Sequence, residues 1–435
     1  MQRLRHRPAS LYSSRAMILP RNLIIYASSL IAPFIMVVLS LLYPKDPASR
    51  NVIWIFVVYY GTVFFIANGS GADSVRHAAW LEYMHQGDMS LGELTSLLFA
   101  EGSQYQDIYQ PLVTFFVSLF TGSHAVLFAT FGVLFGYVYS RNVWFLIDRV
   151  PGSGNLLLLF LLVAFAFQVN IGSSLNGVRM GTALHVFAYG VMHYLSTGNR
   201  KFIIVMFLST LVHFSLWLPC VVLVLYFFIR HLGMGIYCFF LVSLVMTNLD
   251  ISIVKTLISY FPIPIDERAS SYINAAAVNP DIMALRGESL AWFLKINQTL
   301  TSIFFVTSAS WMIWRGVLND KGLIRSLLLL GMLLYGVINL LNYIPSLGRF
   351  YNLAGMLLLA SVILYLATSN RQKMFDNAFF SMLALLLIID LALAVRLMLG
   401  FTSIWLITGN FITAPFVEAD QSLYQSLMWV LSSFL

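Results

Sequence analysis

The sequence predicts an all-α polytopic integral membrane protein that forms a single transmembrane domain over residues 1–435. Of its 435 residues, 59% are hydrophobic and only 10% are charged, whereas soluble domains carry roughly 25% charged residues. Apolar runs of about 17–25 residues, the length that spans hydrocarbon as a helix, recur along the whole chain. The ten-residue alternation typical of outer-membrane barrels is absent. We therefore expect about twelve transmembrane helices, joined by short turns and two long periplasmic loops.

The apolar runs place these helices in order. Residues 1–21 are rich in arginine, and the run that follows is longer than a signal peptide and lacks a small-residue cleavage site, so we expect a retained helix. Pro219 is expected to break one run and leave a short helix that ends near Arg230. The other expected spans cover 22–43, 51–68, 123–146, 153–170, 177–196, 201–217, 233–251, 292–313, 323–343, 352–368 and 377–399.

Two long polar segments separate groups of spans, at residues 69–109 and 252–291. The first carries the single arginine Arg76 against the acidic residues Asp73, Glu82, Asp88, Glu93, Glu101 and Asp107. A loop so poor in Lys and Arg is expected on the non-cytoplasmic side. The apolar run 111–120 that follows is too short to span, which favours a re-entrant or interfacial helix.

Basic residues gather in alternate turns, which sets the orientation by the positive-inside rule. The turns expected in the cytoplasm contain Arg141 and Arg149; Arg200 and Lys201; Arg230 and His231; Arg315, Lys321 and Arg325; and Arg371 and Lys373. The long loops and the turns at 173–179 and 346–349 then lie outside. Twelve spans would put the arginine-rich residues 1–21 outside as well, against the rule. Either translation begins at Met17, or the later loops outweigh the first.

Several classes of function are excluded by composition and motif. The net charge of +7 is scattered over short turns and forms no stripe, so we expect no nucleic-acid partner. Cys220 and Cys238 both lie in apolar runs and offer neither a disulfide framework nor zinc-ligand spacing. Walker, Rossmann, HExxH and GxSxG motifs are absent from suitable contexts. We expect no metal and no cofactor.

Ionisable residues that are not in the basic turns gather on the expected outer face. Arg179 begins one apolar helix and His213 lies near the end of the next, and such groups are costly in lipid, so they indicate a functional site. Structural roles remain open, because Arg179 can reach the interface as a snorkelling side chain and His213 can be a hydrogen-bonded core residue. The other candidates on this face are Asp73, Arg76, His77, Arg268, Arg286, Arg349 and Tyr351.

Short motifs connect these candidates to a known family. They are Gly71-Ala72-Asp73, Tyr109-Gln110-Pro111, Asn176-Gly177-Val178-Arg179 before a basic hairpin, Leu211-Val212-His213-Phe214-Ser215, and Arg349-Phe350-Tyr351. Together they resemble the EpsG/Wzy-like family of bacterial surface-polysaccharide polymerases. The central block from Asn176 to Ser215 is the most specific. One departure is that Ser74 and His77 stand where the family often has tyrosines.

The resemblance implies a multi-pass enzyme of the bacterial inner membrane, with a GT-C-like helical bundle and no metal. Such an enzyme joins undecaprenyl-diphosphate-linked oligosaccharide repeat units, donor to acceptor, on the periplasmic face. Membrane lipid and a chain-length regulator protein are the further partners implied. Asp73 or His213 would be the catalytic base. The diphosphate and sugar would be bound by Arg76, His77, Arg179, Arg268, Arg286, Arg349 and Tyr351.

Three other functions remain open on the residues alone. A glycosyltransferase that uses a polyprenyl-monophosphate sugar needs a similar outer site, and an O-antigen ligase differs only in its acceptor. A lipid-linked-sugar flippase or other transporter would have internal repeats and ionisable groups near the membrane midplane. The polar residues gather on one face and no convincing repeat is visible, so we favour the polymerase.

Overall fold

The computed structural model describes residues 10–66, 72–99, 107–151, 155–246, 291–341, 344, 347–368, 373–417 and 420–433, with side chains described from Arg21 onward. The described residues are 81% helical and contain no strands. Five helical segments are long and apolar enough to cross a membrane. They are His124–Ile147, Leu156–Asn176, Leu323–Leu340, Leu347–Thr368 and Met374–Leu399. The predicted all-α class is confirmed in the described residues, and five helices have the length and composition of membrane spans; the prediction of twelve spans stays a prediction.

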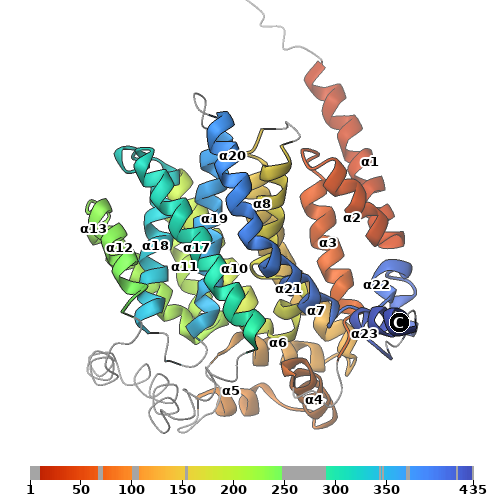
Figure 1. The fold of residues 1–435 in the computed structure, drawn as a ribbon. Helices are drawn as coiled ribbons and strands as arrows, with labels where there is room; N and C mark the ends of the chain where they lie inside the picture. The colour runs from red at the N-terminus through yellow and green to blue at the C-terminus, as the bar shows by residue number, and fades with distance from the viewer. Residues whose placement is uncertain are drawn as a thin grey trace, which may run out of the picture.

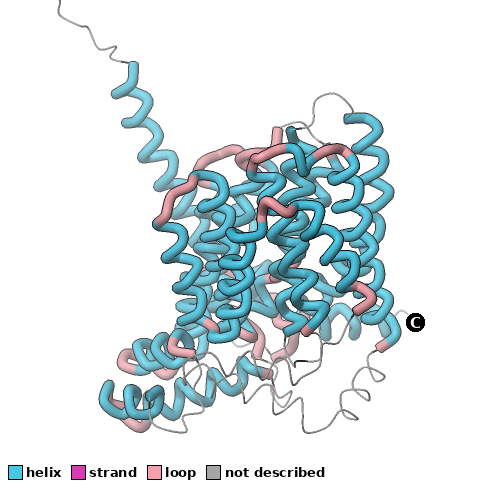
Figure 2. The backbone as a smooth tube through the Cα atoms, turned by 90° about the vertical axis from the view of Figure 1, so that its left-hand side faces the viewer, coloured by secondary structure: helices cyan, strands magenta, loops and turns pink. Residues whose placement is uncertain are grey.

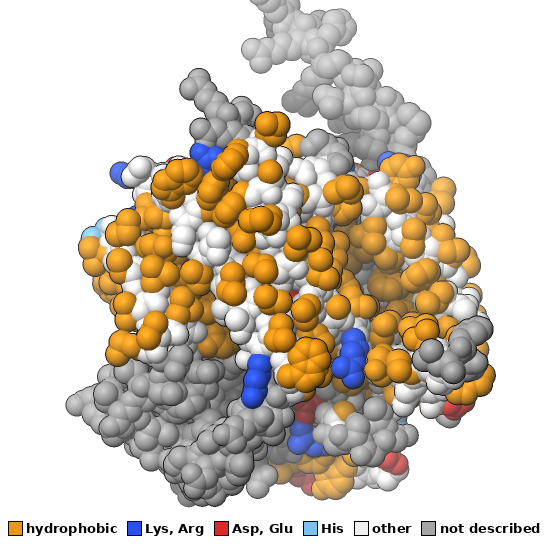
Figure 3. Space-filling view, in the orientation of Figure 1, with side chains coloured by type: hydrophobic (Ala, Val, Ile, Leu, Met, Phe, Trp, Pro, Cys, Tyr) orange, Lys and Arg blue, Asp and Glu red, His pale blue; other side chains and the backbone are white. Residues whose placement is uncertain are grey.

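These segments pack side by side with other helices in one bundle (Figure 1). In chain order its helices are α3 (Ser49–Thr62), α7 (His124–Ile147), α8 (Leu156–Phe167), α9 (Ile171–Asn176), α10 (Val178–Thr197), α11 (Lys201–Val212), α12 (Trp217–Ile229), α13 (Gly233–Ser243), α17 (Trp292–Trp314), α18 (Leu323–Leu340), α19 (Phe350–Thr368), α20 (Lys373–Ala384) and α21 (Ile388–Leu399). Short 3₁₀ turns extend or interrupt them: η1 (Phe214–Leu216), η2 (Val317–Asn319), η3 (Leu347–Arg349) and η4 (Leu385–Leu387). Hydrophobic side chains cover most of the face drawn in Figure 3, with Lys and Arg side chains near its two ends.

Close helix contact in this bundle depends on small residues, as expected where lipid supplies no hydrophobic drive between helices. The α3–α7 pair is an example. A Cβ at Gly61 would lie 2.3 Å from the carbonyl oxygen of Phe128, and one at Gly132 would lie 2.7 Å from that of Val57. The two backbones are therefore nearly in contact, and this contact fixes α7, whose first residues lie at the same end of the bundle as the outer polar residues.

Three shorter helices lie across one end of the bundle (Figure 2). They are α4 (Asp73–Gln86), α5 (Leu91–Phe99) and α6 (Tyr109–Ser118), and a small core of Met84, Leu94, Leu98 and Phe115 joins them. The segment predicted as a polar loop is thus largely helical. Phe116 and Phe120 remain exposed, 54% and 84%. The predicted short helix after the loop is confirmed, and its exposed rings suit the lipid interface.

The first predicted span, 22–43, is wrong. Helix α1 (Ser10–Ile31) ends at Ala32, and α2 (Pro33–Leu42) runs back beside it (Figure 1). Arg21 consequently pairs with Asp46, 25 residues away, although a continuous helix would hold them about 37 Å apart. The hairpin returns the chain to the end at which it entered.

This hairpin also sets the end of the bundle at which Arg21 lies. Lys45, next to the Arg21–Asp46 pair, donates to the Val150 carbonyl oxygen at 2.7 Å, at the end of the bundle where α7 finishes. Arg149 donates to Ser196 Oγ at 3.0 Å at that same end. The start of α1 therefore lies with the basic turns and not opposite them, as the positive-inside rule requires.

The break predicted at Pro219 occurs earlier, at His213. Helix α11 ends at Val212, His213 is extended (φ −147°, ψ 119°), and the chain resumes through η1 into α12. Pro219 lies inside the first turn of α12, where a missing N–H costs nothing because those amides have no intrahelical partner. The C-terminal residues form α22 (Trp405–Thr408), η5 (Ala414–Phe416) and α23 (Leu423–Ser433), at the end opposite the start of α1 (Figure 1).

Candidate active site

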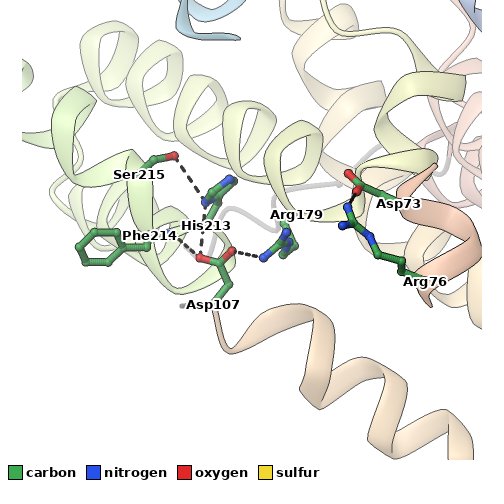
Figure 4. Close-up of polar contacts among 7 residues, drawn as sticks. All are labelled: Asp73, Arg76, Asp107, Arg179, His213, Phe214 and Ser215. Carbon is green, nitrogen blue, oxygen red and sulfur yellow. Dashed lines mark hydrogen bonds and ion pairs between the residues drawn. The ribbon is translucent and has the colours of Figure 1, made fainter. Parts of the chain in front are cut away.

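A buried carboxylate, Asp107, joins the helix breaks at the end of the bundle covered by α4–α6 (Figure 4). Its Oδ2 accepts a hydrogen bond from Arg179 Nη1 at 2.9 Å, and its Oδ1 accepts one from the Phe214 backbone N–H at 2.6 Å. His213 Nδ1 lies 3.4 Å from Oδ1. The Asp107 side chain is 1% exposed, so these contacts are made away from solvent.

The local sequence explains how Arg179 reaches this carboxylate. Asn170 caps α9 with its side chain, α9 ends at Asn176, and Gly177 turns the chain into α10. Arg179 thus falls in the first turn of α10, where the helix dipole disfavours a cation. Asp107 supplies the negative charge that offsets this cost.

The break at His213 supplies the second contact. Because His213 is extended, the Phe214 N–H is free of the α11 hydrogen-bond ladder and points to Asp107. The His213 ring is itself buried, with 8% of its side chain exposed, and Ser215 Oγ lies 3.4 Å from Nδ1. Both Asp107 and Ser215 therefore face the same ring nitrogen.

The environment keeps Asp107 ionised. Burial is the largest single influence and raises the pKa of Asp107, while the hydrogen bond and attraction from His213 lower it. The Phe214 N–H and the Arg179 charge lower it further, and the net pKa lies below its ordinary value. An ionised Asp107 favours the His213 tautomer with hydrogen on Nδ1, which leaves the Nε2 lone pair to accept a proton.

The contact with Asp107 orients Arg179 but engages only part of its guanidinium group. A guanidinium carries five N–H donors, one nitrogen contacts Asp107, and 39% of the side chain is exposed. An Arg fork of this kind matches phosphate oxygens geometrically. Asp107 thus orients Arg179, and part of the guanidinium side chain stays exposed.

Asp73 and Arg76 lie beside this cluster. They pair with each other on the first turn of α4, with Arg76 72% exposed, and Asp73 Oδ2 lies 3.7 Å from where a Cβ on Gly177 would stand. The Ser74 N–H donates to Asn176 Oδ1 at 3.1 Å and fixes α4 to the turn before α10. The structure therefore brings Asp73, Arg76, Arg179 and His213 to one end of the bundle, as the sequence predicted.

His77, one helical turn after Asp73, is buried and packs against the Phe131 ring at 6.2 Å between centroids. Burial lowers the pKa of His77 to about 4; Asp73 opposes this shift and Arg179 adds to it. At neutral pH His77 is uncharged, so it offers a hydrogen bond to a ligand and no positive charge.

This shift gives a pH dependence of stability. The ordinary pKa of 6.5 applies to the unfolded chain, and the folded value is about 4. Between these values the unfolded chain binds more protons, so the free energy of unfolding falls as the pH is lowered through that window. The contribution from His77 is at most about 3 kcal/mol.

We expect His77→Gln to flatten the loss of thermal stability between pH 6.5 and about 4, measured on detergent-purified protein. His124→Gln, at an exposed histidine that begins α7, is the control and should keep the wild-type slope. A His77→Gln protein that loses stability as steeply as the wild type would show that His77 is not held neutral.

The remaining predicted site residues are not joined to this cluster. Tyr351 donates to Asn339 Oδ1 at 2.8 Å and packs on Tyr335, within the contact between α18 and α19. Arg349 is exposed on η3, and in the described part of the chain no hydrogen bond or ion pair links it to Asp107 or Arg179. Arg268 and Arg286 lie outside the described residues, as does the segment 252–291 up to residue 290.

Asp107 is the functional residue that the sequence prediction missed. It was only one of the acidic residues of a polar loop. Two signals point to it: it stands two residues before the Tyr109-Gln110-Pro111 motif, and an arginine at the start of an apolar helix needs a carboxylate partner. Within the described residues, no group of three or more His, Cys, Asp or Glu side chains is placed to hold a metal ion.

Comparison of the chain with protein-family models, with curated proteins and with solved structures found no match.

Proposed function

We propose that this protein is a membrane glycosyltransferase that joins polyprenyl-diphosphate-linked oligosaccharide repeat units, in the manner of the EpsG/Wzy-like polymerases. The observation that carries the proposal is the Asp107–Arg179–His213 cluster. It combines an oriented, partly exposed arginine with a carboxylate-oriented histidine at one end of a lipid-compatible bundle. This is what transfer from a lipid diphosphate requires.

The donor's departure is the step that needs positive charge. As the bond between the sugar and the diphosphate breaks, its electron pair moves onto a phosphate oxygen. Arg179 is already held in place by Asp107, so it can stabilise that charge without reorganising. Arg76, on the first turn of α4, lies beside the start of α10, the helix that carries Arg179. Its side chain is 72% exposed, so we assign it as a second contact to the phosphate.

The acceptor's hydroxyl must lose a proton as the new glycosidic bond forms. His213 suits this role because Asp107 faces its Nδ1 and leaves Nε2 as the proton acceptor. Asp73 is the alternative base, but its carboxylate already accepts a hydrogen bond from Arg76. We therefore assign the base to His213, in preference to Asp73.

The substrate's two parts match the two environments at this end of the molecule. The exposed apolar rings of Phe116 and Phe120 on and after α6 would lie against an isoprenoid tail, while the polar cluster meets the diphosphate. The site then works where lipid ends and water begins, on the side expected to be periplasmic.

The experiment that tests this function is the surface-polysaccharide banding pattern of a strain that lacks the gene. Loss of the long ladder, with a single repeat unit left on its acceptor, is the expected result. Loss of the single-unit band as well would point to an earlier glycosyltransferase, a ligase or a transporter, and would overturn the proposal. Complementation with the wild-type gene is the control.

A further inference from the structure

A second polar site lies within the span formed by α20, η4 and α21. Asp390 falls in the first turn of α21, just after the 3₁₀ turn that interrupts the span, and Figure 1 shows the bend there. The span is the least buried of the five, with 22% of its most apolar 18-residue stretch covered. An ionisable group at membrane depth indicates function by default, and a 3₁₀ interruption often marks a functional position.

Two neutral amides hold the Asp390 carboxylate. Gln168, just after α8, donates from Nε2 to Oδ2 at 3.2 Å, and Asn297 on α17 donates from Nδ2 to Oδ1 at 2.9 Å. Gly355 makes room for the first amide, because a Cβ there would lie 2.4 Å from Gln168 Oε1. Residues of α17, of α19 and of the end of α8 thus form the surroundings of the Asp390 carboxylate on α21.

Two side-chain oxygens on α17 have no hydrogen-bond partner. Asn297 Oδ1 and Thr301 Oγ1 are both buried without a hydrogen bond, and they lie one helical turn apart on the same face of α17. Buried polar atoms in native proteins nearly always have hydrogen-bond partners, so these two oxygens without partners indicate a ligand-binding site. An amide oxygen and a carboxylate can only accept, so that ligand must be a cation or a donor.

The Asn297 and Gln168 amides can be oriented for a site with a bound cation or for a site without one. Turning the Asn297 amide by 180° exchanges its nitrogen and oxygen, which brings Oδ1 against the Asp390 carboxylate. Two acceptors can face each other only with a cation between them. In the present orientation the N–H groups of Asn297 and Gln168 take the place of that cation.

We propose that Asp390, Asn297, Thr301 and Gln168 bind a monovalent metal cation, with Na⁺ as the ligand to test. All four offer hard oxygen atoms, and one carboxylate balances one charge, whereas divalent ions such as Ca²⁺ favour several carboxylates. Protonation of Asp390 would engage one oxygen and leave the buried Asn297 and Thr301 oxygens without partners. The site is separate from the Asp107 cluster and does not rest on the proposed glycosyl transfer.

The test is thermal unfolding of the full-length protein in detergent, titrated with NaCl and, in parallel, with choline chloride at equal ionic strength. Wild-type protein should gain about 2–4 °C with Na⁺ in a saturable way, and none with choline. Asp390→Asn should lose the Na⁺-specific gain, while Asp148→Asn, an exposed aspartate after α7, should keep it.

Thr301→Val covers the case in which Asp390→Asn does not fold. It removes only one ligand oxygen and should move the Na⁺ midpoint to a roughly 10-fold higher concentration. Identical curves in NaCl and choline chloride for the wild type would overturn the proposal. So would a midpoint that responds to pH and not to Na⁺, which would assign Asp390 to proton binding.

Discussion

Replacing Arg179 by alanine is expected to abolish long polymer while the protein still inserts in normal amounts. The substitution removes the guanidinium that Asp107 holds in place beside the proposed donor diphosphate. Loss of a preorganised charge-stabilising group costs about 10²–10³-fold in rate. The measurement is the ladder pattern of the deletion strain carrying the variant, with membrane levels quantified by immunoblot.

Two further variants sharpen the result for Arg179. Arg179→Lys keeps the charge and loses the planar fork, so we expect little recovery if bidentate phosphate contact matters. Arg230→Ala removes an exposed arginine after α12, among the basic turns at the other end of the bundle, and should leave the ladder intact. A full ladder from Arg179→Ala would remove Arg179 from the mechanism.

Asp107→Asn is expected to have the second largest effect, through residues that it positions. The amide can still accept from the Phe214 N–H, but its NH₂ group meets the Arg179 donor, and the negative charge that faces His213 is lost. We expect a loss of about 10²–10⁴-fold in polymerisation rate, the range associated with a positioned general base. The same ladder assay, with radiolabelled repeat unit to follow initial rates, measures it.

A double-mutant cycle separates positioning from simple damage to the fold. If Asp107 acts through Arg179, the losses caused by Asp107→Asn and by Arg179→Ala should be less than additive in the double variant, because residues that act as a unit are not additive. Additive losses would contradict the positioning role. Asp148→Asn is again the matched control and should polymerise normally.

Hydropathy located most helices because each lies within one apolar run bounded by polar turns; α7 and α17 match their predicted ranges within about a residue. It failed where a turn carries no polar residue. The chain reverses at Ala32 inside an unbroken apolar run, and only Pro33 marks the place, since the residue before a proline avoids helical geometry.

The site was predictable only in part for a related reason. Arg179 and His213 stand out because they are ionisable residues in apolar helices. Asp107 does not stand out, because an aspartate in a polar loop is ordinary. Its role comes from contacts with residues 72 and 107 positions away. Such pairings arise from helix packing, and a single sequence does not encode them in any local pattern.

The hairpin of α1 and α2 changes whether the expected number of membrane crossings is odd or even. A hydrophobic stretch that dips in and returns adds nothing to the number of crossings, although hydropathy alone counts it as one. The start of α1 and the C-terminal α23 consequently lie on opposite faces of the bundle (Figure 1). We expect reporters inserted at the start of α1 and in α23 to lie on opposite sides of the membrane, so neither can stand in for the other in a topology map.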